Sequence, residues 1–525
     1  MKKSLALLTL LMLPISIFAE TLADRIDTVF KAYTGWFVKI IFAEFPVFGY
    51  SIPWVLVVLL AGAIFFTIRF RFPQFSLFRL SIRVVSGKLD KLDHHESYDI
   101  AEDPTLNAGG DIPETIAIEG HKGEVSHFQA LTAALSATVG LGNIAGVAVA
   151  VSIGGPGATF WMILAGMLGM ASKFAECTLG VKYRDINEEG VVFGGPMYYL
   201  SKGLKSIGFA SLGKVLAIFF AVMVIGGSFG GGNMFQANQA SKQFIKLFGI
   251  ADPNAGIYFG ILMSVLVAIV IIGGIKRIAQ VTEKLVPFMA VIYVGAALVI
   301  IFMNIPLIPR AIGEIFSGAF SGAGIAGGAI GVLIQGFRRG TFSNEAGVGS
   351  AAIAHSAVKT RYPASEGIVA LLEPFIDTVV ICTMTALVLV ITNLKFGLFE
   401  YGTEIKQGVE LTANAFDSVI PHFSIILTIA VILFAFSTMI SWSYYGMQGW
   451  MYLFGRNKTV DLVYKILFLF FVIVGASIKL GSVLDFSDAM IFAMVVPNMI
   501  GVVLLSPKIK EEVARYLKAI KEYGK

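Results

Sequence analysis

The sequence predicts an all-α, polytopic membrane protein with eleven transmembrane helices, in which one leading helix precedes two five-helix repeats of opposite orientation. Three observations predict this fold class: an apolar composition, eleven apolar segments long enough to cross a bilayer, and a matching pair of glycine-interrupted segments. Hydrophobic residues make up 56% of the chain and charged residues only 14%, and the mean hydropathy is +0.79. A soluble domain of this composition would have too few polar groups to cover its surface. We therefore expect the protein to lie in the lipid bilayer.

Charge and cysteine content exclude other classes. The net charge of +5 does not indicate a nucleic-acid partner, because the basic residues are spread over short loops and form no patch with interleaved aromatic residues. The two cysteines, Cys177 and Cys382, both fall in apolar segments. Their number alone excludes a disulfide framework and a cysteine-rich metal site, and we expect both thiols to be small buried apolar groups.

The first 49 residues precede the predicted helical bundle. Residues 1–19 contain two lysines, then an apolar stretch, then Ala19, which predicts a secretory signal peptide cleaved near that alanine. An uncleaved anchor helix is the alternative. Residues 20–49 place Arg25, Lys31 and Lys39 among Phe, Trp and Ile, which is typical of an amphipathic segment on the outer membrane interface.

Eleven apolar segments then reach the length of about 20 residues that a membrane-crossing helix needs. The leading helix, at 50–70, is followed by a cytoplasmic loop at 71–127. The first five-helix repeat covers residues 128–305 and the second covers 306–505, before a tail at 506–525. The predicted spans are Tyr50–Phe70, Phe128–Val151, Thr159–Val181, Leu212–Gln236, Ile257–Gly274, Leu285–Ile305, Ala319–Phe337, Ile368–Thr392, Ser424–Tyr445, Val460–Ile478 and Asp488–Leu505.

Basic residues alternate between successive loops. They are concentrated after the first, third, fifth, seventh and ninth spans and in the tail, and those after the seventh span include Arg338 and Arg339. Because Lys and Arg favour the cytoplasmic side, the pattern predicts a mature N-terminus outside and a cytoplasmic C-terminus. We expect the cell inner (plasma) membrane as the location. The acidic segment 85–124 is interpreted as a solvated cytoplasmic loop.

Two glycine-rich spans stand at matching positions. Each opens a five-span unit, and an odd number of spans reverses the orientation of the second unit. Such a pair of interrupted helices indicates a binding site at mid-membrane, where backbone groups left unpaired by the break line a cavity. The alternative is that the glycines only let helices pack closely. The second span reads ALSATVGLGNIAGVAVA, with Gly140, Gly142 and Gly146, and the seventh reads SGAFSGAGIAGGAIGVLIQGFRR, with Gly322, Gly324, Gly327 and Gly328.

Several motifs carry a family resemblance. In chain order they are TVGLGNIAGVA, GGPGATFW, KFAECTLGVKYR, GGPMYYL, GGNMFQANQ, GFRRGTFSNEAGVGSAAIAHSA, EGIVALLEPFIDT and FSTMISWSYYG. Through these motifs, from about residue 128 to 505, the chain resembles the alanine or glycine:cation symporter family. The resemblance implies the leucine-transporter fold, an inverted five-helix repeat with broken helices, behind one extra leading helix. It also implies alanine or glycine as substrate and sodium as the coupling ion.

The second span supplies the first candidate ligands. A helix break at Gly140–Gly142 would free three backbone carbonyls, and carbonyl oxygens suit a hard cation such as sodium. Amide groups of the restarted half-helix suit a substrate carboxylate. We expect Thr138 and Asn143 to serve both ion and substrate, since the asparagine side chain donates and accepts. A plain helix cap is the alternative for Asn143. The freed carbonyls are those of Ser136, Thr138 and Val139.

The ninth span adds two adjacent hydroxyls, Ser437 and Thr438. The fold implied by the resemblance places them opposite the carbonyls of Ser136 and Val139, which closes a sodium site. Hydroxyls that bond to their own helix are the alternative. Trp442 lies one turn beyond Thr438, on the same face, where its indole would exclude large side chains. An ordinary packing tryptophan is the alternative there.

Two further polar residues lie in or at the end of apolar spans. Gln236, which we prefer over Gln239, is expected to bond the charged ends of the substrate. Asp377 lies deep in the eighth span, and an ionisable group at mid-membrane is a functional hypothesis by default because it is costly there. We expect it to be a sodium ligand. A structural hydrogen bond to a neighbouring span is the alternative.

Enzyme motifs are not supported by their context. The string GGSFG at 226–230 falls in a glycine-rich helix rather than between a strand and a helix, and the six histidines lie in loops or at span ends. We therefore expect a carrier rather than an enzyme, with no cofactor besides the coupling ion and no obligatory protein partner. A proton-coupled carrier of the same fold, with Asp377 as the proton site, is the first alternative, and an ion channel is the second.

Overall fold

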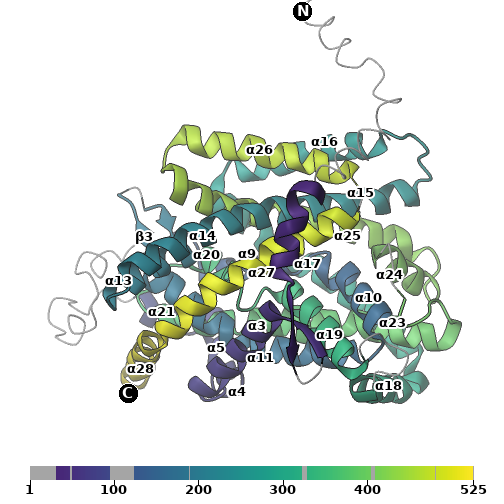
Figure 1. Ribbon diagram of the computed structural model, residues 1–525, viewed down its shortest axis with the longest axis horizontal. Coiled ribbons are helices and arrows are strands. Elements are labelled where there is room, and N and C mark those ends of the chain that lie inside the picture. The colour runs from purple at the N-terminus through teal and green to yellow at the C-terminus, as the bar shows by residue number, and fades with distance from the viewer. Residues whose placement is uncertain are drawn as a thin grey trace, which may run out of the picture.

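The computed structural model describes residues 31–47, 50–94, 123–188, 190–321, 328–403, 408–478 and 480–523. In these ranges the protein is mostly helical, and many of the long helices run side by side roughly along the longest axis of the molecule (Figure 1). One end of that axis carries α13, α28 and β3, and the other carries α18, α23 and α24. The predicted signal peptide at 1–19 and most of the acidic segment 85–124 lie outside the described residues.

The elements of the first half begin with helical residues 31–41. They continue as β1 (Glu44–Val47), β2 (Tyr50–Pro53), α3 (Trp54–Arg69), α4 (Pro73–Ser76), α5 (Phe78–Val85), α6 (Asp90–His94), α9 (His127–Thr138), η2 (Gly142–Gly146), α10 (Val147–Gly154), α11 (Ala158–Lys182), β3 (Asp185–Ile186), β4 (Val192–Phe193), α12 (Pro196–Tyr198), η3 (Tyr199–Gly203), α13 (Leu204–Ser206), α14 (Ala210–Phe229), η4 (Gly230–Met234), α15 (Phe235–Leu247), α16 (Ala255–Ile271) and α17 (Gly274–Met303).

The named elements of the second half are all helices in its described residues. Its elements are η5 (Ile305–Leu307), α18 (Ile308–Ser321), α19 (Gly328–Asn344), α20 (Ala351–His355), α21 (Pro363–Ala370), α22 (Leu372–Pro374), η6 (Phe375–Cys382), α23 (Thr383–Phe396), α24 (Gly408–Asp417), α25 (Phe423–Phe454), α26 (Lys458–Ser477), α27 (Leu480–Leu504) and α28 (Ser506–Tyr523). The predicted tail at 506–525 is thus largely one helix.

Seven helices among the described residues are long and apolar enough to cross a membrane, or eight if the bent pair α9 and η2–α10 counts as one span. The predicted number of eleven is not confirmed. Two of the expected spans correspond to α3 and α16, with 16 and 17 residues, which is shorter than the roughly 20 residues of a full crossing. The expected seventh span, 319–337, covers the end of α18, undescribed residues and part of α19.

Two small hairpins qualify the all-α prediction. Strand β1 pairs antiparallel with β2, and β3 pairs antiparallel with β4. Tyr50–Pro53 was expected to open the leading helix, but these residues form β2, and α3 begins directly after Pro53. Proline cannot continue a helical hydrogen-bond ladder from the residue before it, whereas it is tolerated at the edge of a strand or before a helix. The leading helix therefore begins four residues later than predicted.

The first predicted helix break is present. Helix α9 starts from a capping box: the Ser126 side chain accepts from the Gln129 amide and the Gln129 side chain accepts from the Ser126 amide, which satisfies two otherwise unpaired donors. It ends at Thr138, because Val139 has ψ 83 and leaves the helical region. The chain resumes as the π-helical turn η2 and then α10, at an angle of 51°.

The structure shows a helix interruption beyond the predicted one in the second half. We expected the break at the glycines of 322–328, of which 322–327 lie outside the described residues. In the described part, α19 runs unbroken from Gly328 to Asn344, and the interruption occupies Glu345–Ser350 before α20. Glu345, Gly347 and Gly349 all have positive φ values there, 54, 84 and 93°, which no α-helix can contain.

The two interrupted helices lie side by side. Helix α9 packs against α20, and α10 packs against α19, so the two half-helices before and after each break meet their counterparts from the other segment. Helix α19 also contacts η2 directly. The two breaks, at 139–142 and 345–350, are therefore brought together from positions about two hundred residues apart.

Arg338 and Arg339 were expected in a cytoplasmic loop, but both lie within α19. Their guanidinium groups donate to one carboxylate oxygen of Asp488 on α27, at 2.7 and 2.6 Å. Arg339 is 4% exposed and Asp488 is fully buried. A prediction from hydropathy ends a span at two adjacent cations. In the structure the helix continues through them, because the buried Asp488 carboxylate pairs with both.

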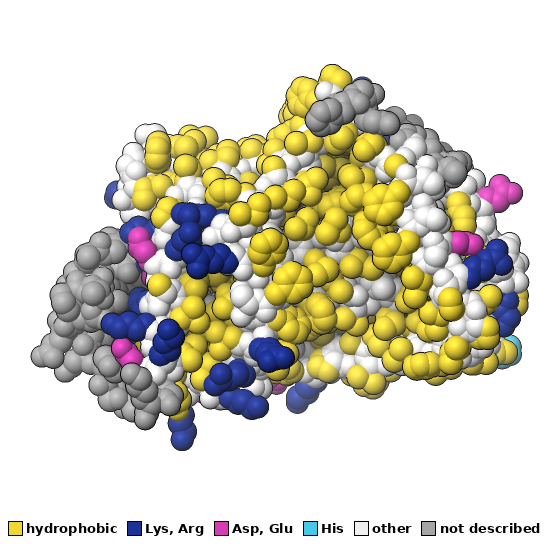
Figure 2. Space-filling view, turned by 90° about the horizontal axis from the view of Figure 1, so that it is seen from below, with side chains coloured by type: hydrophobic (Ala, Val, Ile, Leu, Met, Phe, Trp, Pro, Cys, Tyr) yellow, Lys and Arg dark blue, Asp and Glu magenta, His cyan; other side chains and the backbone are white. Residues whose placement is uncertain are grey.

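The surface fits a lipid environment. Figure 2 shows one face covered by a broad band of hydrophobic side chains, with Lys and Arg gathered mainly toward the end that carries α28. Large apolar side chains such as Val215, Ile272 and Val291 are 64, 71 and 72% exposed. A contiguous apolar surface of this kind marks a membrane or protein contact rather than a water-facing surface.

The residues before α3 fold back onto the bundle. The indole of Trp54 donates to the carbonyl of Ile40 at 2.9 Å. The ring of Phe42 lies 4.5 Å from the guanidinium carbon of Arg338 and packs edge-on against Phe492 of α27. The segment from 31 to 53 thus touches the same two helices, α19 and α27, that Arg338 and Asp488 join.

Candidate functional site

The first break is joined to α25 by a hydrogen bond. In an uninterrupted helix the Gly140 amide would donate to the carbonyl of Ser136. Here that carbonyl accepts instead from the hydroxyl of Thr438 at 3.0 Å, and the Gly140 amide donates to the side chain of Asn143 at 2.9 Å. The Ser136 hydroxyl donates in turn to the carbonyl of Ser437 at 2.7 Å. The expected meeting of α9 and α25 is present.

Gly140 allows this close approach. An ideal Cβ on Gly140 would lie 2.5 Å from Oγ1 of Thr438 and 3.4 Å from Oε1 of Gln236. Any side chain would therefore push α25 away from the break. Gly142 is less constrained, since a Cβ there would meet the Cα of Ser343 at an ordinary 3.6 Å. The two glycines of the motif thus have different structural roles.

A second polar group surrounds Asp377 in the π-helical segment η6. One carboxylate oxygen of Asp377 accepts from the Asn143 side-chain amide at 2.6 Å. The other accepts from the hydroxyls of Ser343 and Thr378 at 2.9 and 2.7 Å. The thiol of Cys382 lies 3.3 Å from both Asn143 and Ser343. All five residues are buried, and they come from three segments: η2, the end of α19, and η6.

Gln236 reaches the break from a third direction. Its Oε1 accepts from the Leu141 amide at 3.3 Å and its Nε2 donates to the Gly231 carbonyl at 3.0 Å. It therefore contacts the half-helix restart, as the preferred candidate should. Gln239 instead donates to the neighbouring Asn238 side chain. Gln236 belongs to α15, next to the π-helical turn η4, and such turns often occur at functional sites.

Trp442 lies one turn beyond Thr438 on α25 and is 1% exposed. Its indole N–H donates to the carboxylate of Glu345 at 3.1 Å. On the other side the indole contacts η4, where a Cβ added to Gly232 would lie 2.3 Å from Trp442 Cβ and Cγ. The indole is therefore held between the second break and η4.

Two predicted ligands point into their own helices. The hydroxyl of Thr138 donates to the Ala134 carbonyl at 3.2 Å, and that of Ser437 donates to the Phe434 carbonyl at 3.0 Å. These are the own-helix bonds that we set against a ligand role. Val139 is the C-terminal cap of α9, so it belongs to the break through its backbone. Among the predicted hydroxyls, only that of Thr438 crosses between helices to the break.

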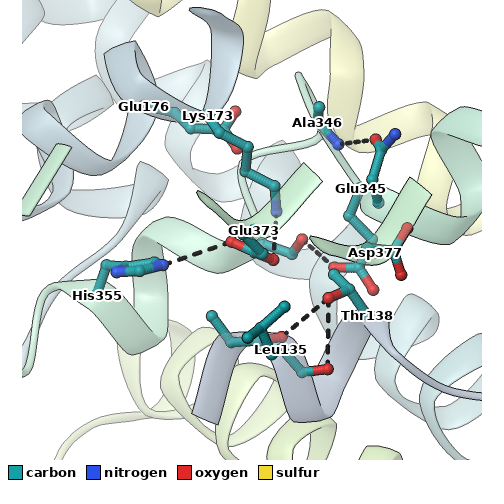
Figure 3. A network of polar contacts seen from close by, with 12 residues as sticks. Leu135, Thr138, Lys173, Glu176, Glu345, Ala346, His355, Glu373 and Asp377 are labelled. Carbon is teal, nitrogen blue, oxygen red and sulfur yellow. Dashed lines mark hydrogen bonds and ion pairs between the residues drawn. The ribbon is translucent and has the colours of Figure 1, made fainter. Parts of the chain in front are cut away.

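A buried charged chain next to the site was not predicted. The Glu373 carboxylate accepts from Lys173 of α11 at 2.9 Å and contacts His355 at 3.4 Å (Figure 3). His355 also contacts Glu366, and Glu366 contacts His127, the first residue of α9. His127 reaches further to Asp93 at 3.2 Å. His127 and His355 lie at helix ends, as expected of the histidines, but they are buried, with exposed fractions of 4 and 0%.

One sequence motif could have indicated the second break. The motif SNEAGVGS has two glycines one residue apart, as Gly140 and Gly142 are in the first break, and polar residues precede them. The residues missed there are Ser343, Asn344 and Glu345. No comparable signal marks Lys173 or the two histidines, because their burial depends on partners from other helices.

The chemistry of this arrangement is binding rather than bond making. Backbone carbonyls, hydroxyls, amides and one buried carboxylate gather at two helix breaks inside an apolar bundle, and hard cations prefer such oxygen ligands. Interrupted helices at mid-depth are the usual substrate and ion sites of secondary transporters. The fold and the site define a multi-pass membrane transporter of the broken-helix class.

The chain belongs to the sodium:alanine symporter family, whose family model matches residues 112–525. It is 42% identical to the sodium/alanine symporter AgcS of Methanococcus maripaludis over 461 residues, which covers 88% of this chain and 93% of that protein. It is 34% identical to the probable sodium/glutamine symporter GlnT of Bacillus subtilis, covering 86% of this chain and 85% of that protein.

A solved structure shares the fold. The crystal structure of MhsT in complex with L-phenylalanine matches with a TM-score of 0.54 over 74% of this chain and 90% of that chain, at 15% identity. Together with the family, this likeness confirms the leucine-transporter type of fold. The family and the relatives confirm that the protein is a membrane-embedded amino-acid:cation symporter and not an enzyme.

Proposed function

We propose that the protein carries small neutral amino acids, alanine and glycine, into the cell together with sodium, by alternating access. The observation that carries this proposal is the bond from Thr438 to the Ser136 carbonyl at the first helix break. It brings a hydroxyl oxygen of α25 and a carbonyl oxygen released from the helical ladder of α9 within 3.0 Å of each other. Two such oxygens on separate helices are what a bound sodium ion would hold together.

The first sodium position is formed by Ser136, Val139 and Thr438, with Ser437 contributing after a change of its side-chain rotamer. The carbonyl of Ser136 is already turned toward Thr438. Because α9 and α25 are the two walls of this position, an ion there favours the arrangement in which they touch. Release of the ion weakens that contact, which couples sodium binding to movement of the helices.

The second position is formed by Asp377, Asn143 and Ser343. The described neighbours of the Asp377 carboxylate are hydrogen-bond donors without charge. A buried carboxylate surrounded in this way favours a bound cation, so sodium is the first candidate. The same observation favours a proton as the second candidate, and this is the feature that would distinguish a proton-coupled carrier from a sodium-coupled one.

The amino acid is placed between the two breaks. Its carboxylate fits the amides at Gly140–Gly142, where the restarted half-helix presents its positive end, with Thr138, Asn143 and Gln236 nearby. The indole of Trp442 forms the wall of the site next to the side chain of the bound amino acid. The printed names of the relatives include both alanine and glutamine carriers, so the wall is the feature that we connect with a preference for small side chains.

Alternating access is supported by the pairing of the half-helices. We assign α9 and α20 to the cytoplasmic side and α10 and α19 to the outer side, within repeats at 128–305 and 306–505, in the inner membrane. The driving force is adequate: moving one charge through 100 mV yields about 2.3 kcal/mol. That free energy corresponds to roughly fiftyfold accumulation of substrate per sodium ion.

Uptake of labelled alanine and glycine into proteoliposomes, with and without an inward sodium gradient, tests the proposal. We expect accumulation that needs sodium and disappears when choline replaces sodium at fixed pH. Accumulation driven by a pH gradient in choline would instead assign a proton to Asp377. Flux that does not saturate and shows no exchange of labelled for unlabelled alanine would indicate a channel.

A further inference from the structure

The indole of Trp442 is fixed at both of its edges. Its N–H donates to Oε1 of Glu345, and its Cβ and Cγ lie against the backbone of Gly232 in η4. Gly227, one turn before η4, also lies beside the ring. A Cβ on Gly227 would lie 3.4 Å from Cζ3 of Trp442. A buried indole N–H requires a hydrogen-bond acceptor. Glu345 is that acceptor.

Glu345 has a costly conformation. Its φ is 54°, in the left-handed region that residues other than Gly, Asn and Asp rarely adopt. Its backbone is held there by bonds from its amide to the Thr341 carbonyl and from the Val348 amide to its own carbonyl. Strain of this kind is typically kept at functional positions, where the surrounding structure enforces it.

The carboxylate of Glu345 is also oriented from its far side. The hydroxyl of Ser350, the residue before α20, donates to Oε2, while Oε1 faces the indole. Lys173 of α11 attracts the carboxylate and Glu373 repels it. Glu345 is only 3% exposed, so solvent competes little with its bond to the indole. The orientation of the indole is thus fixed by the second helix break.

The position of the indole matters because of its neighbours on α25 and α19. Thr438, four residues earlier on the same face of α25, touches the first break, and Phe342 and Ser343, just before Glu345, lie within 3.7 Å of where a Gly142 side chain would begin. Glu345 and Trp442 therefore connect the second break to the wall beside the first. Among the described residues, neither side chain bonds to the backbone of the first break; they bond to one another and to Ser350.

We propose that Glu345 is a positioning residue that holds the Trp442 indole as the wall of the amino-acid site and thereby sets the largest side chain the carrier accepts. The proposal rests on the proposed function, because it takes Trp442 as the wall of a substrate site. Without the acceptor, the indole N–H must find another partner, and the ring turns away from its present plane. The space next to the substrate then grows, and larger amino acids enter.

A double-mutant cycle tests this inference through selectivity. Inhibition of labelled alanine uptake by unlabelled alanine, valine and leucine is measured for the parent, E345A, E345Q, W442F and E345A/W442F. We expect E345A to lower the preference for alanine over valine by about tenfold, the lower end of what one hydrophobic contact discriminates. E345Q keeps an oxygen acceptor for the indole and should restore most of the parent's preference.

The decisive outcome is the double variant. Phenylalanine has no N–H, so in the W442F background the E345A change should no longer alter selectivity. If E345A changes selectivity equally in both backgrounds, the positioning role of Glu345 is wrong. The role is also wrong if E345A leaves selectivity at the parent's value while W442F relaxes it, and in that case Trp442 stays the proposed wall. If neither W442F nor E345A alters the preference, the wall itself is wrong. Should E345A fail to reach the membrane, S350A in both backgrounds carries the same comparison, because it removes the hydroxyl that orients the carboxylate from its far side.

Discussion

The hydroxyl of Thr438 on α25 donates to the backbone carbonyl of Ser136 on α9 at 3.0 Å. The two helices are therefore joined where α9 stops, by two oxygen atoms that share one proton. A cation that takes both oxygens as ligands would displace that proton from the line between them and keep the helices together. The sodium dependence of transport is thus expected to be sensitive to this one hydroxyl.

T438V is expected to raise the sodium concentration needed for half-maximal alanine uptake. Valine keeps the branched shape but removes the oxygen, so the first sodium position loses a ligand. The measurement is uptake in proteoliposomes over a sodium series at saturating alanine. T392V is the matched control, because the buried Thr392 hydroxyl bonds only to its own helix, to the carbonyls of Val388 and Leu389. An unchanged sodium dependence in T438V would remove the hydroxyl from the site.

N143A is expected to lose most transport while still inserting in the membrane. The change deletes the acceptor for the Gly140 amide and the donor to Asp377 without adding a charge. Uptake and the amount of protein in the membrane are measured together. N414A, on the exposed side of α24, is the control and should behave like the parent. Uptake in N143A within twofold of the parent would contradict the assignment.

G140A is expected to abolish uptake. The new methyl group would lie 2.5 Å from Oγ1 of Thr438, and Thr438 cannot turn away freely because its β-carbon is branched. G146A, at the end of the π-helical turn η2 that follows the break, is the control, because a Cβ there meets nothing within 4 Å. Full activity in both variants would show that the close approach of α25 to the break is not needed for transport.

W442A is expected to relax the preference for alanine over valine and leucine rather than to invert it. A hydrophobic wall discriminates by only about 1–3 kcal/mol per methylene group. Alanine itself should bind more weakly, since the enlarged site loses contacts on that side. Competition of labelled alanine uptake by unlabelled glycine, alanine, valine and leucine measures both effects. A mutant with the parent's rank order and spacing would make Trp442 a packing residue.

K173M is expected to lower the free energy of unfolding by about 3–5 kcal/mol, because it leaves the buried Glu373 carboxylate without its cation. Both side chains of this pair are fully buried. Thermal unfolding of the detergent-solubilised protein measures the change, and K173M/E373L should recover part of it. K246M removes a half-exposed partner of Glu410 and should cost about 0–1 kcal/mol. Equal losses in K173M and K246M would contradict the buried pairing.

The first break could be predicted from the sequence because its signal is local. Gly140 and Gly142 interrupt an apolar span, and Asn143 follows them. The meeting of Thr438 with Ser136 could not be derived from spacing alone, since the two residues are 302 positions apart. It was expected only through the family resemblance. Trp442 was expected as a wall from its place one turn beyond Thr438, and this role stays a prediction. No periodicity indicates its polar partner, Glu345.

The interruption at 345–350 was not predicted, for a physical reason. Long apolar runs dominate any hydropathy pattern. The apolar run at 319–337 was therefore predicted as the span, and its glycines were predicted as the break. The interruption that the structure describes follows Asn344. It contains Glu345 with φ 54°, a conformation for which glutamate has no preference. The predicted span ends before Arg338 and Arg339, because the pattern could not show that both pair with the buried Asp488 carboxylate.

The buried histidines show a third limit. His127 begins a helix and His355 ends one, so their positions along the chain suggest water. Their burial comes from carboxylates on α6, α21 and α22 that the fold delivers to them. Burial of a polar residue is decided by such partners rather than by its neighbours in sequence.

The contact of Phe42 with Arg338 has a practical consequence for anyone who shortens the chain. A version that started at Trp54 would keep all the helices from α3 onward. It would nevertheless lose the Phe42 ring that covers the guanidinium group of Arg338. It would also lose the Ile40 carbonyl that accepts from the Trp54 indole. The leading segment is thus best treated as part of the folded unit, and an affinity tag is better attached after α28 than in place of residues 31–53.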